Sequence, residues 1–395
     1  MFNKLSDRVK AIKPSPTLAV SNLASQLRAE GRDIIGLGAG EPDFDTPQFI
    51  KDAAIEAIKN GQTKYTAVDG TAELKNAIIN KFKNDNNLEY QADQILVSCG
   101  GKQSFYNLAQ AAINAGDEVI IPAPYWVSYP DMVILAEGVP VVVQAGIETG
   151  FKMTPAMLEA AITSKTRMMV LNSPSNPTGT AYSKAELTGL GEVLLRYPDI
   201  LIVTDDMYEH IIWNEEGFCN IVNACPALYE RTMVFNGVSK AYAMTGWRIG
   251  YAGGPADIIK AMKKIQSQST SNPASVSQAA AVAALTGDQS CIAEMLEQFK
   301  KRHDFLVVAL NSIKHIQCIE SDGTFYSFPN IQSFIDSRDD IKNDVDAANL
   351  LLDQVGVALV PGSAFGAEGY MRISFATSME NLEKAVDRIR QVFEA

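Results

Sequence analysis

The chain has 395 residues, enough for two or three domains, and 47% of them are hydrophobic, as in globular proteins. Its 46 acidic and 34 basic residues give a net charge of −12, which argues against a nucleic-acid-binding surface. Five cysteines without a CxxC pair and three dispersed histidines form no disulfide or metal-binding pattern, so we expect no metal site and a reducing, cytoplasmic location. No apolar run is long enough for a membrane span or a signal peptide, so we expect no membrane partner.

Residues 1–46 precede the first strongly alternating part of the chain. They contain the stretch "DIIGLGAGEPD" (33–43), which we expect to pack with a C-terminal domain rather than to form a domain of its own. Its glycines resemble a dinucleotide-binding fingerprint, but Glu41 stands where that fingerprint requires its last glycine. We therefore expect no dinucleotide site here.

Residues 47–286 alternate short apolar runs with amphipathic helical segments. Apolar runs separated by helices are typical of a mostly parallel sheet with helices on both faces, so we predict a large α/β domain. The helices include 101–116 and 184–197, and the predicted strands are 94–98, 117–122, 167–172, 200–206 and 231–237.

Polar side chains and glycines follow four of these predicted strands. The carboxyl ends of parallel strands lie at one edge of a sheet, where α/β proteins bind their ligands, so we expect these residues to meet. They are Gly100 and Gly101, Asn176, the group Asp205, Asp206 and Tyr208, and Lys240.

Taken singly, each of these residues has a structural explanation: a surface lysine, a helix-capping carboxylate or a turn-forming asparagine. Together they form the set that a pyridoxal phosphate site requires. A lysine amine binds the cofactor's aldehyde covalently, and a carboxylate pairs with its ring nitrogen. Gly100 and Gly101 at a helix start, with Arg248, suit its phosphate. An ATP-binding P-loop is excluded because Leu96 and Gln103 occupy two of its defining positions.

The pattern changes in residues 287–395. A long amphipathic helix (292–313) is followed by short strands near 316–328 and 356–360, the stretch "YMRISFAT" (370–377) and a final helix (378–393). This order predicts a smaller α+β domain.

Seven motifs carry a resemblance that covers essentially the whole chain. They are "GAGEPDFDTP", "GGKQSFYN", "PYWVSYP", "NSPSNPTG", "TDDMYEH", "SKAYAMTGWRIGY" and "VPGSAFG" followed by "YMRISFA". In this order they resemble the fold-type I, class I pyridoxal-phosphate-dependent aminotransferases, and within them the bacterial aspartate aminotransferase subgroup. The resemblance implies a seven-stranded, mostly parallel sheet in the large domain and a smaller α+β domain.

The resemblance also implies a role for each motif residue. Lys240 would bind the cofactor and then move the proton at the substrate α-carbon. The other implied cofactor contacts are Asp205 to the ring nitrogen, Tyr208 and Asn176 to the ring oxygen, Trp126 stacked on the ring, and Arg248 with Gly101, Lys102 and Gln103 at the phosphate. The implied substrate-binding residues are Gly40, Lys102, Trp126, Asn176 and Arg372, of which Arg372 would bind the α-carboxylate and Lys102 the distal carboxylate.

Tyr65 concerns the assembly of the protein, and Gly237 departs from the family pattern. Tyr65 resembles the tyrosine that reaches the phosphate of the neighbouring subunit, which implies a homodimer with shared active sites. Gly237 stands where many family members have a phosphate-binding serine, and we assign no role to Ser239.

The activity that the resemblance implies is transfer of an amino group from L-aspartate to 2-oxoglutarate. Prephenate or aromatic amino acid transamination is the first alternative, and a β-lyase or decarboxylase on the same fold is a second. A transcription regulator of this fold would carry an added N-terminal DNA-binding domain, and only about a dozen residues precede "KPSPT" here.

Overall fold

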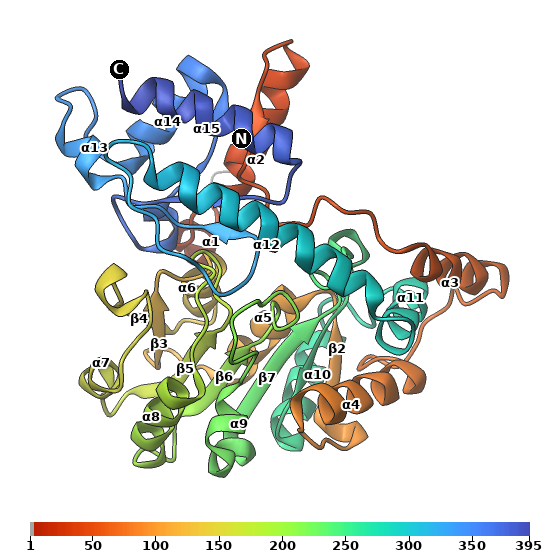
Figure 1. Cartoon of the computed structure of the whole chain (residues 1–395). Helices are drawn as coiled ribbons and strands as arrows, with labels where there is room; N and C mark the ends of the chain where they lie inside the picture. The colour runs from red at the N-terminus through yellow and green to blue at the C-terminus, as the bar shows by residue number, and fades with distance from the viewer. Residues whose placement is uncertain (1–3) are drawn as a thin grey trace.

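The protein was analysed as a computed structural model that describes residues 4–395. Two layered parts lie one above the other, and the long helix α12 (Ser290–Asn311) runs along the boundary between them (Figure 1). The lower part is built around a large sheet with helices on both faces, and the upper part holds the C-terminal helices (Figure 1). The fold class predicted from the sequence is confirmed.

The large sheet has seven strands in the order β2-β8-β7-β6-β5-β3-β4. Every adjacent pair is parallel except those made by β8, which is antiparallel to both β7 and β2. The strands are β2 (Ile95–Ser98), β3 (Glu118–Ala123), β4 (Val139–Gln144), β5 (Thr166–Asn172), β6 (Leu201–Asp205), β7 (Thr232–Gly237) and β8 (Gly250–Gly253). The five strands predicted from apolar runs are all present.

Alternate residues of these strands face two separate hydrophobic cores, as the two-residue period of a strand requires. On one face, Val97, Leu171 and Val234 pack with α3 (Gln48–Lys59), α4 (Ala72–Asn86), α8 (Lys184–Leu195), α9 (Ile221–Ala224) and α11 (Ser275–Thr286). On the other face, Leu96 and Phe235 pack with α5 (Gly101–Ala112), α6 (Ser128–Leu135) and α10 (Ala256–Ser267). Burial on both faces explains why the strands read as continuous apolar runs.

The upper part contains two small sheets and its own core. Strands β11 (Val360–Pro361), β12 (Met371–Ser374) and β9 (Tyr326–Ser327) form an antiparallel sheet, and β1 (Ile35–Gly36) pairs in parallel with β10 (Val357–Ala358). Its helices are α13 (Gln332–Asp336), α14 (Asp344–Val355) and α15 (Met379–Phe393). The β1–β10 pair joins the N-terminal segment to this part, so we propose domain boundaries close to residues 46 and 287.

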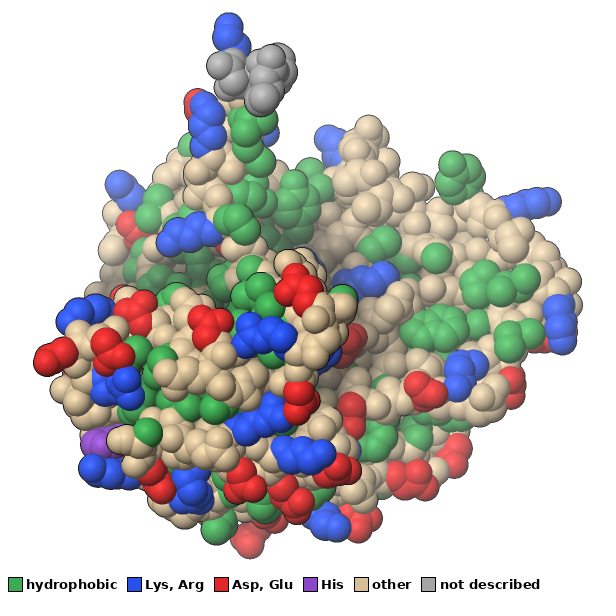
Figure 2. All heavy atoms as spheres, turned by 90° about the horizontal axis from the view of Figure 1, so that it is seen from above, with side chains coloured by type: hydrophobic (Ala, Val, Ile, Leu, Met, Phe, Trp, Pro, Cys, Tyr) green, Lys and Arg blue, Asp and Glu red, His purple; other side chains and the backbone are tan. Residues whose placement is uncertain are grey.

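Helix α7 (Pro155–Ala161) also packs on the first face of the large sheet, through Leu158, whereas α1 (Asp7–Ala11) and α2 (Pro16–Ala29) belong to the N-terminal segment. In residues 4–395 every helix is too short or too polar to cross a membrane. Seen from above, the molecule is hollowed between its two parts, with Lys and Arg side chains at the edge of the hollow (Figure 2).

Candidate active site

A cavity of about 460 Å³ opens between the two parts, at the carboxyl ends of β5, β6 and β7. Residues from both parts and from the start of α2 line it. The structure brings together on its wall these predicted site residues: Gly40, Gly101, Lys102, Trp126, Asn176, Asp205, Tyr208, Lys240, Arg248 and Arg372. Gly100, Gln103 and Tyr65 do not line it, and Asp206 is wholly buried with Thr204 and Asn220 as its hydrogen-bond partners.

Lys240 follows strand β7 and, with Lys102, is one of the two lysines among the described residues that line this cavity. Its Nζ donates a hydrogen bond of 2.5 Å to the carbonyl oxygen of Gly40 and lies 5.8 Å from the ring centre of Tyr208. Burial, and then the positive charge of Arg372, lower the pKa of Lys240 to about 8. Far more of this amine is therefore uncharged near neutral pH than in an ordinary lysine, and the uncharged form can act as a nucleophile or a base.

Asp205 ends strand β6, and two donors hold its carboxylate. Tyr129 Oη donates a 2.5 Å hydrogen bond to Oδ2, and the backbone N–H of Met207 donates one of 3.3 Å to Oδ1. Burial raises the pKa of Asp205, while the bonds from Tyr129 and Met207 and the charge of Lys240 act against that rise. Burial therefore dominates, and a cation placed beside this carboxylate would favour its charged form.

Tyr129 was not predicted as a site residue. It lies in the first turn of α6, three residues after Trp126, and the two rings meet edge to face with centroids 5.1 Å apart. The N–H of Tyr129 donates a 3.1 Å hydrogen bond to the Trp126 carbonyl, and this turn before the helix brings the two rings together. Both residues stand in the stretch "PYWVSYP". The strength of its bond to Asp205 could come only from the structure.

Arg372 lies in β12 and is 2% exposed. Its Nη1 donates to Asn176 Oδ1 at 2.9 Å and its Nη2 to the Gly38 carbonyl at 2.7 Å. Its Nε has no hydrogen-bond partner among the described residues. A buried guanidinium with an unmet donor at a cavity wall is suited to an anionic ligand such as a carboxylate.

Tyr326 is a second site residue that the sequence did not indicate. Its hydroxyl lies 3.0 Å from that of Tyr208, and the guanidinium of Arg372 lies 4.5 Å from its ring centre. Strand β9 brings it there by pairing with β12, where Tyr326 stands opposite Ser374. No local pattern predicts that register, because the two strands are far apart in the sequence.

The start of helix α5 forms a second cationic region of the cavity. Gly100 precedes the helix with a φ of +85°, and a Cβ there would overlap the guanidinium of Arg248. Arg248 is fixed by hydrogen bonds to the carbonyls of Thr245 (2.8 Å) and Cys99 (3.3 Å). An uncapped helix start beside an arginine is a ready anion site.

Lys102, in the first turn of α5, lies with its Nζ 5.2 Å from the ring centre of Trp126. Burial, and then the charge of Arg248, lower the pKa of Lys102. Besides Lys240 and Arg248, two further basic side chains, Lys102 and Arg372, line the cavity from different parts of the chain.

Gly237, where the family pattern often has serine, is explained by the pairing of β7 with β8. A Cβ at this position would lie 3.0 Å from the carbonyl oxygen of Ile249 and 3.1 Å from Gly250 Cα. Ser239, to which the sequence gave no role, is buried and lines the cavity.

Tyr65 lies apart from the cavity of its own chain. Its side chain is 91% exposed, in the loop that precedes α4. A large aromatic residue so fully exposed is available to a second molecule.

Comparison with known proteins gives a consistent result. Residues 32–389 match the family model described as aminotransferase class I and II. An aspartate/prephenate aminotransferase of Nitrosomonas europaea is 64% identical over 98% of both chains, and one of Cereibacter sphaeroides is 55% identical over 98% of both.

Solved structures agree with these sequence relatives. An aspartate aminotransferase of Rhizobium meliloti is 48% identical, with a TM-score of 0.96 over 100% of this chain and 99% of the other. The Thermus thermophilus aspartate aminotransferase with maleate is 42% identical, with a TM-score of 0.92 over 99% of this chain and 100% of the other. The chain therefore belongs to the class I and II aminotransferase family.

Proposed function

We propose that this aminotransferase transfers the amino group of L-aspartate to 2-oxoglutarate, with pyridoxal phosphate as cofactor. The observation that carries the substrate assignment is that one cavity contains both Lys102 and Arg372. Aspartate, oxaloacetate, glutamate and 2-oxoglutarate all carry two carboxylates, and two cations match them. The Thermus thermophilus aspartate aminotransferase was solved with maleate, which is also a dicarboxylate.

The residues present fit the proposed cofactor. The cavity supplies an amine of lowered pKa at Lys240, a buried carboxylate at Asp205 and an anion site at the start of α5 beside Arg248. Gly100 has no Cβ, and a Cβ at this position would overlap the guanidinium of Arg248. Lys240 would hold the aldehyde, Asp205 the ring nitrogen, Tyr208 and Asn176 the ring oxygen, and Trp126 the ring face. Arg248 would hold the phosphate together with the backbone N–H groups of Gly101 and Lys102, which leaves the Lys102 side chain for the substrate.

When bound, pyridoxal phosphate would supply an electron-accepting ring that stabilises negative charge at the substrate α-carbon. Side chains of the protein would bind the substrate, transfer the proton and stabilise the charge on the ring. Arg372 binds the α-carboxylate, with the Gly40 backbone beside it, and so orients the α-carbon hydrogen toward Lys240. Lys240 then removes this proton and returns a proton as the amino group leaves the substrate. Asp205, held by Tyr129, keeps a negative charge opposite the ring nitrogen.

Prephenate is a second amino acceptor that we propose for the same cavity. The relatives at 64% and 55% identity are named for both substrates. Prephenate carries two carboxylates and a bulky ring, and Leu18, Trp126 and Val127 give the cavity apolar surface for such a ring.

Lys102→Ala tests the substrate assignment. Loss of a charge-assisted contact to the distal carboxylate costs about 2–3 kcal/mol, so kcat/KM for aspartate should fall about a hundredfold. Activity toward a neutral or aromatic donor should remain, because such donors have no distal carboxylate. An equal loss toward every donor would assign Lys102 to phosphate binding instead, and no loss for aspartate would contradict the proposed substrate.

We also propose a cytoplasmic homodimer in which Tyr65 reaches the partner's cavity. The exposure of Tyr65 in the single chain supports this assembly. The five cysteines are all free, which supports a reducing compartment.

A further inference from the structure

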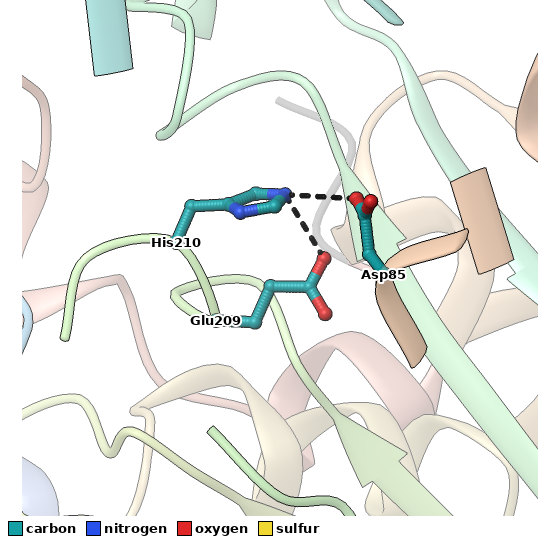
Figure 3. Close-up of side chains that lie close together, drawn as sticks. All are labelled: Asp85, Glu209 and His210. Atoms are coloured by element: carbon teal, nitrogen blue, oxygen red, sulfur yellow. Dashed lines mark ion pairs between the residues drawn. The ribbon is translucent and has the colours of Figure 1, made fainter. Parts of the chain in front are cut away.

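Asp85, Glu209 and His210 form a compact cluster (Figure 3). The Nε2 atom of His210 lies 3.3 Å from Glu209 Oε1 and 3.6 Å from Asp85 Oδ2. Three potential ligand atoms within 4.8 Å of one another have the spacing of a metal site. None of the three lines the cavity described above.

A fourth residue, Lys81 of α4, places a positive charge next to the carboxylates of the cluster. Its ammonium forms an ion pair with Glu209 and lies 3.8 Å from Asp85 Oδ2. A divalent cation bound here would face this fixed positive charge at close range. The cluster is therefore a buried Lys81–Glu209 ion pair flanked by Asp85 and His210, rather than a set of metal ligands.

The Lys81–Glu209 pair is unusually well buried, with side chains 4% and 3% exposed. Burial raises the pKa of Glu209, but Lys81, His210 and Asn86 outweigh it, so that its pKa is below the usual range. The free energy lost when two charges leave water is about as large as the free energy gained from their attraction. Stability alone therefore does not explain why this pair is buried.

The contacts of Glu209 show what else the pair can do. Glu209 directly follows Tyr208, and its Oε1 accepts a 2.8 Å hydrogen bond from Asn236 Nδ2. Asn236 lies in β7, four residues before Lys240, and its own Oδ1 accepts the N–H of Gly237 at 2.7 Å. One carboxylate thus joins the segment that bears Tyr208 to the segment that bears Lys240.

The other Glu209 oxygen fixes this junction to helix α4. Oε2 accepts a 2.6 Å hydrogen bond from Asn86 Nδ2, and Asn86 Oδ1 accepts one of 2.6 Å from Lys81 Nζ. Asn86 is the last residue of α4, so Glu209 is held from three directions. A carboxylate held in this way cannot turn without breaking several bonds.

We propose that Glu209, neutralised by Lys81, is a positioning residue that sets the distance between Tyr208 and Lys240 through its hydrogen bond to Asn236. The inference rests on the proposed function, since it is the cofactor and the α-carbon that these two side chains would serve. Glu209 touches neither Lys102 nor Arg372. Its removal should therefore affect turnover and cofactor affinity much more than substrate KM.

Two double variants separate the hydrogen bond from the charge. Lys81→Met with Glu209→Gln removes both charges but keeps an acceptor for Asn236. Lys81→Met with Glu209→Leu removes the charges and the acceptor, with a side chain of similar volume. We expect the Leu variant to have a kcat at least tenfold below that of the Gln variant, with KM for the amino donor within about threefold.

The same comparison has a readout independent of turnover. The cofactor-free Leu variant should bind pyridoxal phosphate at least tenfold more weakly than the Gln variant in equilibrium dialysis, at a closely similar Tm. Asn236→Ala breaks the same bond without exposing a buried charge and should reproduce both effects, which keeps the test valid if the Leu variant does not fold.

Lys75→Met is the matched control. Lys75 lies on the same helix as Lys81 and forms an ion pair with Asp69, and Lys263 still pairs with Asp69 when Lys75 is replaced. It should leave kcat and cofactor affinity within about twofold of wild type.

Three results would overturn the inference. Equal kcat and equal cofactor affinity in the Leu and Gln variants would show that the bond to Asn236 positions nothing. A fall in Tm alone would reduce the pair to a structural role. Activity abolished by a chelator and restored by a divalent metal, in wild type but not in Asp85→Asn, would make the cluster a metal site. A wild-type protein without transaminase activity would instead refute the proposed function, so the two failures are distinguishable.

Discussion

At Lys240, burial and the charge of Arg372 act in the same direction, and both favour the uncharged amine. Because only the uncharged amine attacks an aldehyde, covalent capture of pyridoxal phosphate by the cofactor-free protein should accelerate as pH rises and level off above a midpoint near 8. Stopped-flow absorbance at a series of pH values measures this midpoint, with Lys240→Ala as the control that shows no covalent phase. A midpoint close to the ordinary lysine value of 10.5 would contradict the described environment of Lys240.

The bond from Tyr129 to Asp205 gives a second prediction for a single residue. Tyr129→Phe removes one charge-assisted hydrogen bond, which is worth about 1.5–3 kcal/mol, and leaves the buried carboxylate easier to protonate. We expect kcat to fall about ten- to a hundredfold with little change in Tm, measured by steady-state kinetics and thermal denaturation. Tyr106→Phe is the control, since the Tyr106 ring packs against the same core and its hydroxyl bonds to no described residue. Similar kinetics for both variants would show that Tyr129 only fills space.

Among the site residues, the sequence predicted those that follow strand ends or stand in recognisable motifs. Lys240 and Asp205 come directly after apolar runs, and the structure places both on the cavity wall. Tyr326 could not be predicted from local pattern, because it reaches the site through the β9–β12 register. Glu209 was hidden for a different reason: its partner Lys81 comes from a helix more than a hundred residues earlier.

At the level of elements, the pairing of β7 with β8 explains the glycine that departs from the family pattern. Gly237→Ser would place a Cβ 3.0 Å from the Ile249 carbonyl oxygen, and the rigid strand pair has little room to move. We expect a loss of about 1–3 kcal/mol in unfolding free energy and no gain in cofactor affinity, measured by denaturant unfolding and by dialysis.

The matched control for this prediction is Gly246→Ser in the loop between the same two strands. A Cβ at Gly246 would meet no described atom within 4 Å, so this variant should be nearly as stable as wild type. Tighter cofactor binding by Gly237→Ser would show that the strands yield and that a serine hydroxyl can serve the phosphate there.

Two strands of the same sheet were not predicted from the sequence. Strands β4 and β8 were absent from the predicted set, because β4 is a partly exposed edge strand with Pro140, and β8 reads "GYAG" without an apolar run. The four valines of β4 do carry a β-branched signal, which Pro140 interrupts, whereas the glycine-rich β8 carries little of it. The direction of β8 depends on tertiary pairing alone.

For the whole molecule, the exposed Tyr65 gives a test of shared active sites. A Lys240→Ala chain and a Tyr65→Ala chain should each be impaired, but their heterodimer should contain one site with both residues intact. After random subunit exchange, activity should recover to about a quarter of the wild-type value, since half of the dimers are mixed and each has one good site. Analytical mass measurements of tagged chains would verify the exchange. Exchange without recovery would argue that Tyr65 serves no partner cavity.

The central claim is that this cavity moves an amino group from aspartate to a keto acid. The most direct measurement is a two-step single turnover by the purified, cofactor-loaded enzyme. L-aspartate added alone should yield about one oxaloacetate per active site and then stop, and 2-oxoglutarate added next should yield about one L-glutamate and restore the initial absorbance. Continuous release of pyruvate or ammonia from aspartate alone, or no product from aspartate while an aromatic donor reacts, would contradict the account.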